Sequence, residues 1–187
     1  WNTKHSTKKI KSNDPRKIWD KLKINLSDKC STERCWLNQE FMHNKTDNRF
    51  NKQTFAPNAP SSWKKNPTEW LNSDDINKVM RQYEYVYPNF RFIGPSPIDF
   101  NKKKLFGQCV WNDLCTFNLS SYIKKGINKI GIIFKTDPHY LSGAHGICLF
   151  ANLKKKFIYY FDSNADDTPK EIRGLIDKIK LQAIANG

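Results

Sequence analysis

The chain has few of the residues that define several common protein classes. It holds only 8 glycines among 187 residues, an odd number of 5 cysteines, and no sustained heptads. These features exclude a collagen-like fibre, a coiled coil and a disulfide-dense scaffold. No run approaches 18 consecutive apolar residues, which excludes a membrane-spanning helix. No signal peptide is visible, so we expect reduced thiols in a cytosolic compartment.

Arginine is scarce although the chain is strongly basic. The net charge is +14, from 32 Lys and Arg against 18 Asp and Glu, but only 6 of these cations are Arg. Such a charge attracts nucleic acid or an acidic surface, whereas the guanidinium fork that reads base edges is rare here. The composition therefore argues against base-specific reading and leaves non-specific nucleic acid binding open.

Bulky apolar residues are plentiful enough for a hydrophobic core. Apolar residues make up 38% and aromatic residues 13% of the chain, a length and composition typical of one domain with an appended arm. We predict an N-terminal arm and extension at residues 1–67 that wraps a core domain at residues 68–187. The start at Trp1 and the stop directly after a helical pattern lead us to expect a piece of a longer protein.

The order of helical and extended patterns predicts an α+β fold with a sheet packed on helices. After a mobile arm at residues 1–14, helices are expected from Asp14-Pro15, from a Ser73 cap, and from a Thr168-Pro169-Lys170-Glu171 capping box. Strands are expected at residues 85–92, 129–135, 145–151 and 157–161.

The last two of these strands predict a hairpin that joins a histidine to an aspartate. If Leu153-Lys154 forms the turn, His145 faces Asp162 at the open end, with Cβ atoms roughly 4.5–5.5 Å apart. A carboxylate bonded to one ring nitrogen leaves the other nitrogen free as a base. A slip of one residue would separate the two side chains, and a surface ion pair is the commoner meaning of such a pattern.

Cysteines elsewhere offer weaker alternatives. Cys148 lies three residues from His145 and therefore on the opposite face of the strand, while Cys109 and Cys115 are expected to be small buried residues. Cys30, Cys35 and His43 could form half a zinc site, but their spacing does not favour one. We therefore predict neither a metal nor a cofactor.

Two segments resemble the ubiquitin-like (SUMO) protease and adenovirus protease clan. One runs from His145 through an apolar strand to Asp162-Ser163 and resembles the His-to-Asp segment of that family. The other matches the family's Trp-Leu-Asn-Asp-Glu-Val-Ile-Asn box at five of eight positions, namely Trp70, Leu71, Asn72, Ile76 and Asn77. The long stretch before Trp70, with its Cys30-to-Trp36 motif, resembles the polyprotein-processing proteases of large DNA viruses of the African swine fever virus type.

The resemblance implies a papain-like core in a viral cysteine endopeptidase. His145 would be the general base, Asp162 its orienting acid, and Trp70 a core anchor at the start of the substrate-side helix; Trp70 and Gly146 would bind substrate. The implied partner is a viral capsid or core precursor polyprotein, cut at Gly-Gly-type sites. The implied location is the virion or the host cytoplasm. The oligomeric state stays open.

Three departures from the family pattern keep alternatives open. No cysteine follows Asp162, Gly146 replaces the family's Trp after the histidine, and Ala151-Asn152 replaces an Ile-Asp pair. We expect the nucleophile beyond Gly187. The chief alternative is a catalytically inactive homologue that serves as a basic structural or scaffold component of a virion, and the second is a non-specific nucleic-acid-binding module.

Overall fold

The computed structural model describes residues 1–43, 45–46, 48–55 and 57–187, and it divides the chain into two compact units. Unit 1 is Trp1–Ala56 and unit 2 is Pro57–Gly187. The division falls ten residues or so before the predicted boundary at 67/68, so that residues 57–67 group with unit 2. The predicted wrapping of residues 1–67 over the core stays a prediction.

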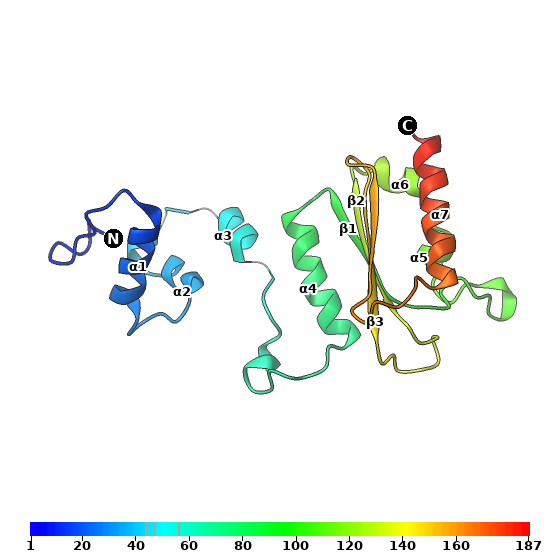
Figure 1. The fold of residues 1–187 in the computed structure, drawn as a ribbon, viewed down its shortest axis with the longest axis horizontal. Helices are drawn as coiled ribbons and strands as arrows, with labels where there is room; N and C mark the ends of the chain where they lie inside the picture. The colour runs from blue at the N-terminus through cyan, green and yellow to red at the C-terminus, as the bar shows by residue number, and fades with distance from the viewer. Residues whose placement is uncertain (44, 47, 56) are drawn as a thin grey trace. The chain divides into compact units, whose positions relative to one another are not determined.

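Unit 1 is built from short helices and loops (Figure 1). Its elements are α1 (Pro15–Leu26), α2 (Glu33–Leu37), the 3-10 helix η1 (Glu40–Met42) and α3 (Asn48–Phe55). Helix α1 begins as predicted, because the Asp14 carboxylate accepts a hydrogen bond from the Arg16 amide at 2.9 Å. Within residues 1–14, the Asn2 side chain pairs with the backbone of Ile10, whose side chain is buried. The mobility of this arm stays a prediction.

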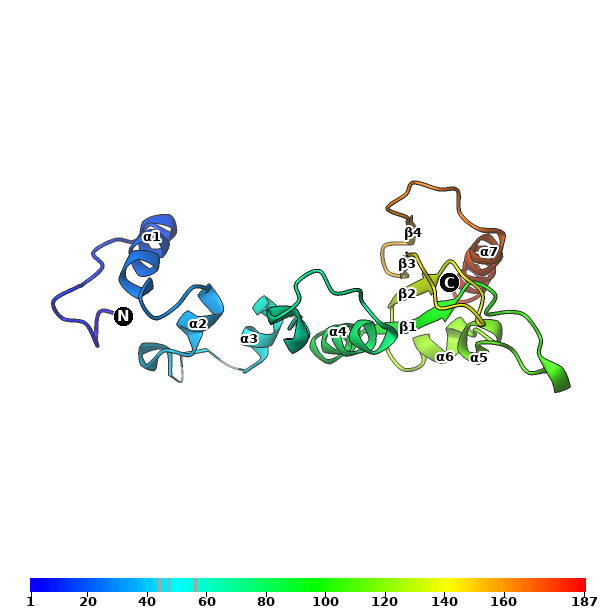
Figure 2. The same cartoon turned by 90° about the horizontal axis from the view of Figure 1, so that it is seen from below.

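Unit 2 contains one mixed sheet with helices on both faces, which confirms the predicted α+β class. The strand order is β1-β2-β3-β4; β1 runs parallel to β2, and the other neighbouring pairs are antiparallel. Figures 1 and 2 place α4 on one face and α5, α6 and α7 on the other. The elements are η2 (Ser61–Lys64), α4 (Ser73–Val86), β1 (Phe90–Pro97), η3 (Leu105–Gly107), α5 (Asn112–Cys115), α6 (Leu119–Ile123), β2 (Lys129–Lys135), β3 (Gly146–Asn152), β4 (Phe157–Phe161) and α7 (Lys170–Ala185).

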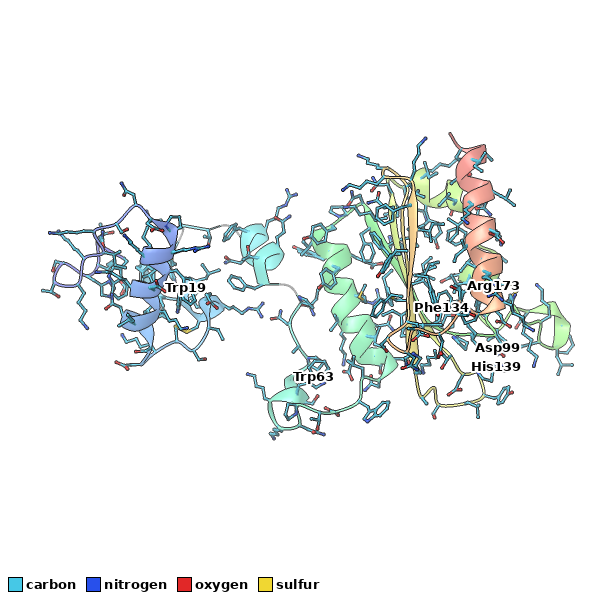
Figure 3. The ribbon with its side chains drawn as sticks, viewed as in Figure 1. Trp19, Trp63, Asp99, Phe134, His139 and Arg173 are labelled. Carbon is cyan, nitrogen blue, oxygen red and sulfur yellow. A yellow bond between two sulfur atoms is a disulfide. The ribbon has the colours of Figure 1, made fainter. Side chains whose placement is uncertain are left out.

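The main core lies between the sheet and α7. Alternate residues of the central strands point to this face, because successive side chains of a strand point to opposite faces. They meet the apolar stripe of α7, as the spacing of its isoleucines and leucine predicts. Phe134 is fully buried here and is labelled in Figure 3. The other buried members include Ile130, Ile132, Ile147, Leu149, Ile172, Leu175 and Ile179.

Three element boundaries differ from the expectations. Helix α4 is capped by Asn72 in a capping box with Asp75, one residue before the predicted Ser73 cap. Helix α7 starts without a side-chain cap, so Thr168 forms no capping box. The Thr168 carbonyl instead accepts a hydrogen bond from the Arg173 guanidinium at 2.6 Å. At α4 the Asn72 side chain accepts a hydrogen bond from the Asp75 amide at 2.9 Å and so satisfies one of the free amides of the first turn.

Strand β1 also differs from the expected range of 85–92. Residues 85 and 86 complete α4, and the strand continues past residue 92 through Gly94-Pro95-Ser96-Pro97. Prolines are tolerated there because β1 is an edge strand and its pairing with β2 is irregular between Ile93 and Ser96. The carboxyl end of β1 therefore lies at the same end of the sheet as the start of β3.

Candidate active site

The hairpin of β3 and β4 sets the geometry of the candidate site. Asn152 pairs with Phe157 and Cys148 with Phe161, so the connection is the four-residue Leu153–Lys156 segment. The predicted two-residue Leu153-Lys154 turn is therefore wrong. Continuing the observed register places Asp162 opposite Ile147 and makes His145 its diagonal neighbour. The error is two residues, an even number, so His145 and Asp162 still share a face.

The structure brings the two predicted catalytic residues into direct contact. His145 Nε2 lies 2.6 Å from Asp162 Oδ1, although their Cα atoms are not directly paired. An imidazole can span this diagonal, since diagonal neighbours on one face lie about 7–8 Å apart. The Asp162 side chain is only 4% exposed and that of His145 is 26% exposed. The pair thus has a shielded carboxylate and an imidazole that solvent can reach.

Asp162 is held by more than the histidine. Its Oδ1 also accepts a hydrogen bond from the Asn164 amide at 2.9 Å, and Tyr160 Oη lies 3.4 Å from Oδ2. The Asn164 amide and then the His145 ring hold the pKa of the Asp162 carboxyl below its ordinary value. Asp162 is therefore charged at neutral pH, and its orientation does not depend on His145 alone.

His145 has one ring nitrogen available for chemistry. When the neutral ring donates Nε2–H to Asp162, Nδ1 carries the lone pair. Within the part of the chain that the structure describes, no hydrogen bond reaches Nδ1. This arrangement can take a proton from an acid placed at Nδ1, while Asp162 stabilises the resulting imidazolium.

Of the two predicted substrate-binding residues, only Gly146 lies next to the His145–Asp162 pair in the chain. Gly146 directly follows His145 and is exposed; a Cβ added there would meet only the Phe134 carbonyl oxygen, at 3.9 Å. Trp70 precedes α4 and is 79% exposed, so its expected role as a core anchor is wrong in this structure. A substrate-binding role for either residue stays a prediction.

The cysteines are arranged differently from the reduced thiols that were expected. Cys30 is joined to Cys35 and Cys109 to Cys115 by disulfides, so these sulfurs are neither thiolate nucleophiles nor zinc ligands in this state. Cys148 is free and lies on the sheet face opposite His145. Burial raises the pKa of the Cys148 thiol, which disfavours the reactive thiolate. Among the described residues, no cluster of three potential ligands could hold a metal ion.

Sequence reasoning missed two supports of Asp162 and a second histidine–aspartate pair. Tyr160 was recognisable, since a residue two before Asp162 on a strand lies on the same face. The second pair joins His139 to Asp99, with Nδ1 and Oδ2 2.7 Å apart. Forty residues separate these two in sequence, and no spacing pattern connects them. Figure 3 labels both side chains, which lie together beside the sheet.

An apolar groove lies at the other end of the hairpin. Its volume is about 600 Å³, and residues of α6, α7 and the Leu153–Lys156 segment line it. It includes neither His145 nor Asp162. None of the described helices is both long and apolar enough to cross a membrane.

The chain is similar to one curated viral protein. It is 35% identical over 153 residues to the "Putative thiol protease R355" of Acanthamoeba polyphaga mimivirus. The match covers 79% of this chain but 47% of the relative, so the chain spans about half the length of the curated relative it matches. The crystal structure of the ASFV pS273R protease aligns with a TM-score of 0.47 and 16% identity, over 93% of this chain and 72% of that one. No protein-family model matches.

Proposed function

We propose that the chain belongs to the SUMO-protease-like viral cysteine peptidases and carries the general base and orienting acid of a viral cysteine endopeptidase. Its similarity to the putative thiol protease of mimivirus and the two segments that resemble the clan support this assignment. The observation that carries the proposal is the 2.6 Å contact between His145 Nε2 and Asp162 Oδ1 at the end of the hairpin. A shielded carboxylate that the Asn164 amide also holds, next to a partly exposed imidazole, is the arrangement that activates a nucleophile.

The proposed first step is proton transfer to His145. Nδ1 takes the proton of a cysteine thiol, and the imidazolium is stabilised by the Asp162 carboxylate. The thiolate then attacks the carbonyl carbon of the scissile peptide bond. As the tetrahedral intermediate collapses, the imidazolium gives its proton to the leaving amine, and a thioester-linked acyl-enzyme remains.

The second step returns the enzyme to its starting state. A water molecule gives a proton to His145 and attacks the thioester carbonyl. The carboxylic acid product leaves, and the sulfur regains its proton from the imidazolium. Asp162 keeps its charge throughout and holds the ring in one tautomer, so its role is orientation and charge stabilisation.

The proposal requires a thiolate from outside the 187 residues. No cysteine follows Asp162 in this sequence, and Cys148 lies on the opposite face with a raised pKa. In the family that the two segments resemble, the nucleophilic cysteine follows the acidic residue. A Gln that helps to form the oxyanion hole precedes this cysteine. The proposed nucleophile is therefore a cysteine that follows Gly187 in the full-length protein.

The proposed substrate is a viral capsid or core precursor polyprotein, and the proposed location is the virion or the host cytoplasm. The family resemblance suggests cleavage at Gly-Gly-type sites. Gly146 leaves open space where the family has Trp, so we expect this chain to bind the glycines of the substrate more weakly. A Gly146→Trp variant should therefore lower KM for a Gly-Gly peptide.

Cleavage of a Gly-Gly peptide by the full-length protein tests this function. His145→Ala should reduce kcat at least about 10³-fold, since it removes the general base. His43→Ala is the matched control, because His43 is an exposed histidine in unit 1. Retained cleavage in His145→Ala, or an equal loss in both variants, would contradict the proposal.

A catalytically inactive structural homologue is the second candidate. It is favoured by the absence of a cysteine after Asp162, by Gly146 in place of Trp, and by the net charge of +14. Intact mass and sequencing of the native protein distinguish the two candidates. A mass well above 22.0 kDa with a later Gln and Cys supports the peptidase, whereas a continuation without that cysteine supports the inactive scaffold.

The charge also permits non-specific nucleic acid binding. Such binding would weaken steeply with salt, because Lys side chains release counterions from phosphates. Titration of duplex DNA at two salt concentrations tests it, and an affinity independent of salt would exclude it.

A further inference from the structure

A loop directly precedes His145 and is closed at its base. It runs from the end of β2 at Lys135 to His145, at the start of β3. The Thr136 amide donates to the His145 carbonyl at 3.0 Å, and the Ala144 amide donates to Asp137 Oδ2 at 3.0 Å. These two bonds close the base of the loop next to His145.

The tip is held by His139 through two hydrogen bonds to one carboxylate. The His139 amide donates to Asp99 Oδ1 at 2.8 Å, and its ring Nδ1 lies 2.7 Å from Asp99 Oδ2. Both side chains are partly shielded, with Asp99 16% and His139 31% exposed. Burial alone would raise the pKa of the Asp99 carboxyl, but the hydrogen bonds from the His139 ring and amide outweigh burial and lower it.

Asp99 itself stands on a rigid part of unit 2. On one side, the Ile98 amide donates to the Asp137 carbonyl at 3.3 Å, which joins the end of β1 to the same loop. On the other side, Phe100 is 3% exposed and packs against Phe134, with ring centroids 5.8 Å apart. The backbone at Asp99 is therefore anchored next to a core residue, Phe100, while its side chain contacts the loop.

We propose that Asp99 and His139 form a latch that positions the loop carrying His145 and so keeps the imidazole on Asp162. Neither latch residue touches the reacting atoms; both are positioning residues. The physical reason is that catalytic geometry must be held within a fraction of an ångström, and displacements of about 1 Å can cost about 10²-fold in rate. The inference rests on the proposed role of His145 as general base.

The latch is most directly tested on the hydrogen bond between His145 and Asp162. In 15N-labelled full-length protein, the Nε2–H proton of His145 should give a downfield imidazole signal that Asp162→Asn removes. Asp99→Ala should broaden or abolish the same signal, because His139 loses both of its hydrogen bonds to Asp99. Asp177→Asn is the matched control, since it also removes one carboxylate charge but changes an exposed residue on α7.

Kinetics provide the second measurement. Asp99→Ala should lower kcat about tenfold with KM within about twofold, because the loop loses both hydrogen bonds to Asp99 and a small displacement of His145 slows the proton transfer. Asp99→Asn should lose only about threefold, since its amide oxygen still accepts the His139 amide. A purely structural role would lower the folded fraction and leave the kcat of folded molecules and the His145 signal unchanged.

The outcomes separate the latch from the proposed function. An unchanged His145 signal and kcat in folded Asp99→Ala overturn the latch. If Asp99→Ala fails to fold, His139→Ala replaces it, because it keeps the backbone bond to Asp99 and should still weaken the signal; an unchanged signal there also overturns the latch. If the unaltered protein cleaves no peptide, the proposed function fails, while the proton signal still decides the latch.

Discussion

Two histidine–aspartate pairs of unit 2 have nearly the same contact distance and different surroundings. His145 and Asp162 are 2.6 Å apart, and His139 and Asp99 are 2.7 Å apart. In the first pair, the carboxylate also binds the Asn164 amide and Tyr160. In the second pair, both carboxylate oxygens bind His139 itself, one through the ring and one through the backbone.

The difference shows why a short contact alone does not identify a catalytic base. Asp162 is oriented by groups of its own strand and the turn that follows, so it can hold the His145 ring in place without constraining its backbone. Asp99 binds both the backbone amide and the ring of His139, so it holds the loop between β2 and β3. The second carboxylate oxygen makes the difference: in Asp162 it binds the Tyr160 hydroxyl, and in Asp99 it binds the backbone amide of the same histidine.

The largest difference expected between the two pairs is the loss of kcat when each aspartate is replaced. Asp162→Ala should lower kcat at least about 10²-fold, because the imidazolium loses its charge partner and the ring its orientation. Asp99→Ala should lose only about tenfold, because it acts through the loop. Single-turnover kinetics of the full-length protein measure both, and equal losses would abolish the distinction.

Acid stability should show the feature that the two pairs share. In the folded state, hydrogen bonds hold the pKa of both carboxyls below its ordinary value. Each therefore stabilises the fold above its unfolded pKa, and this contribution is lost as the pH falls through the lowered folded value. Asp162→Asn and Asp99→Asn should each flatten the fall of the unfolding free energy below about pH 5. Urea unfolding from pH 7 to pH 3 measures the slope; variants with the wild-type slope would contradict the shifts.

The smallest expected effect concerns the hydroxyl of Tyr160. Tyr160→Phe should lower kcat about two- to threefold, because one long hydrogen bond to Asp162 is lost while the ring stays packed. Tyr159→Phe is its control, since Tyr159 is a neighbouring, 56% exposed tyrosine on the other face of β4. If both variants behave alike, Tyr160 does not help to orient Asp162.

Much of the fold was predictable from local pattern. The strand at 129–135 and the strand at 157–161 have the observed bounds, and Asp14-Pro15 starts α1 as expected. These segments carry their own signals, an apolar run between charges or a cap before a proline. The N-caps of α4 and α7 were each misplaced by one residue, since Asn72 caps α4 in place of Ser73 and Pro169 stands at the N-cap of α7 in place of Thr168.

The site was predictable only in part. The shared face of His145 and Asp162 follows from alternation along two strands, and it survived a wrong turn length because the error was an even number of residues. The exposure of Trp70 was not predictable, since a family box describes sequence and not packing. Nor was the pairing of the cysteines, which depends on which sulfurs the folded chain brings within bonding distance.

The α+β class, the apolar faces of the strands and of α7, and the candidate residues His145 and Asp162 could all be inferred from the order of the residues. These depend on periodicity and on residue chemistry, which local segments carry. Only the tertiary structure decided the hairpin register, the support of Asp162 by Asn164, and the meeting of Asp99 with His139. Such features arise when distant segments are held against one core, because the packing of the sheet against its helices sets the distances between side chains that no local pattern relates.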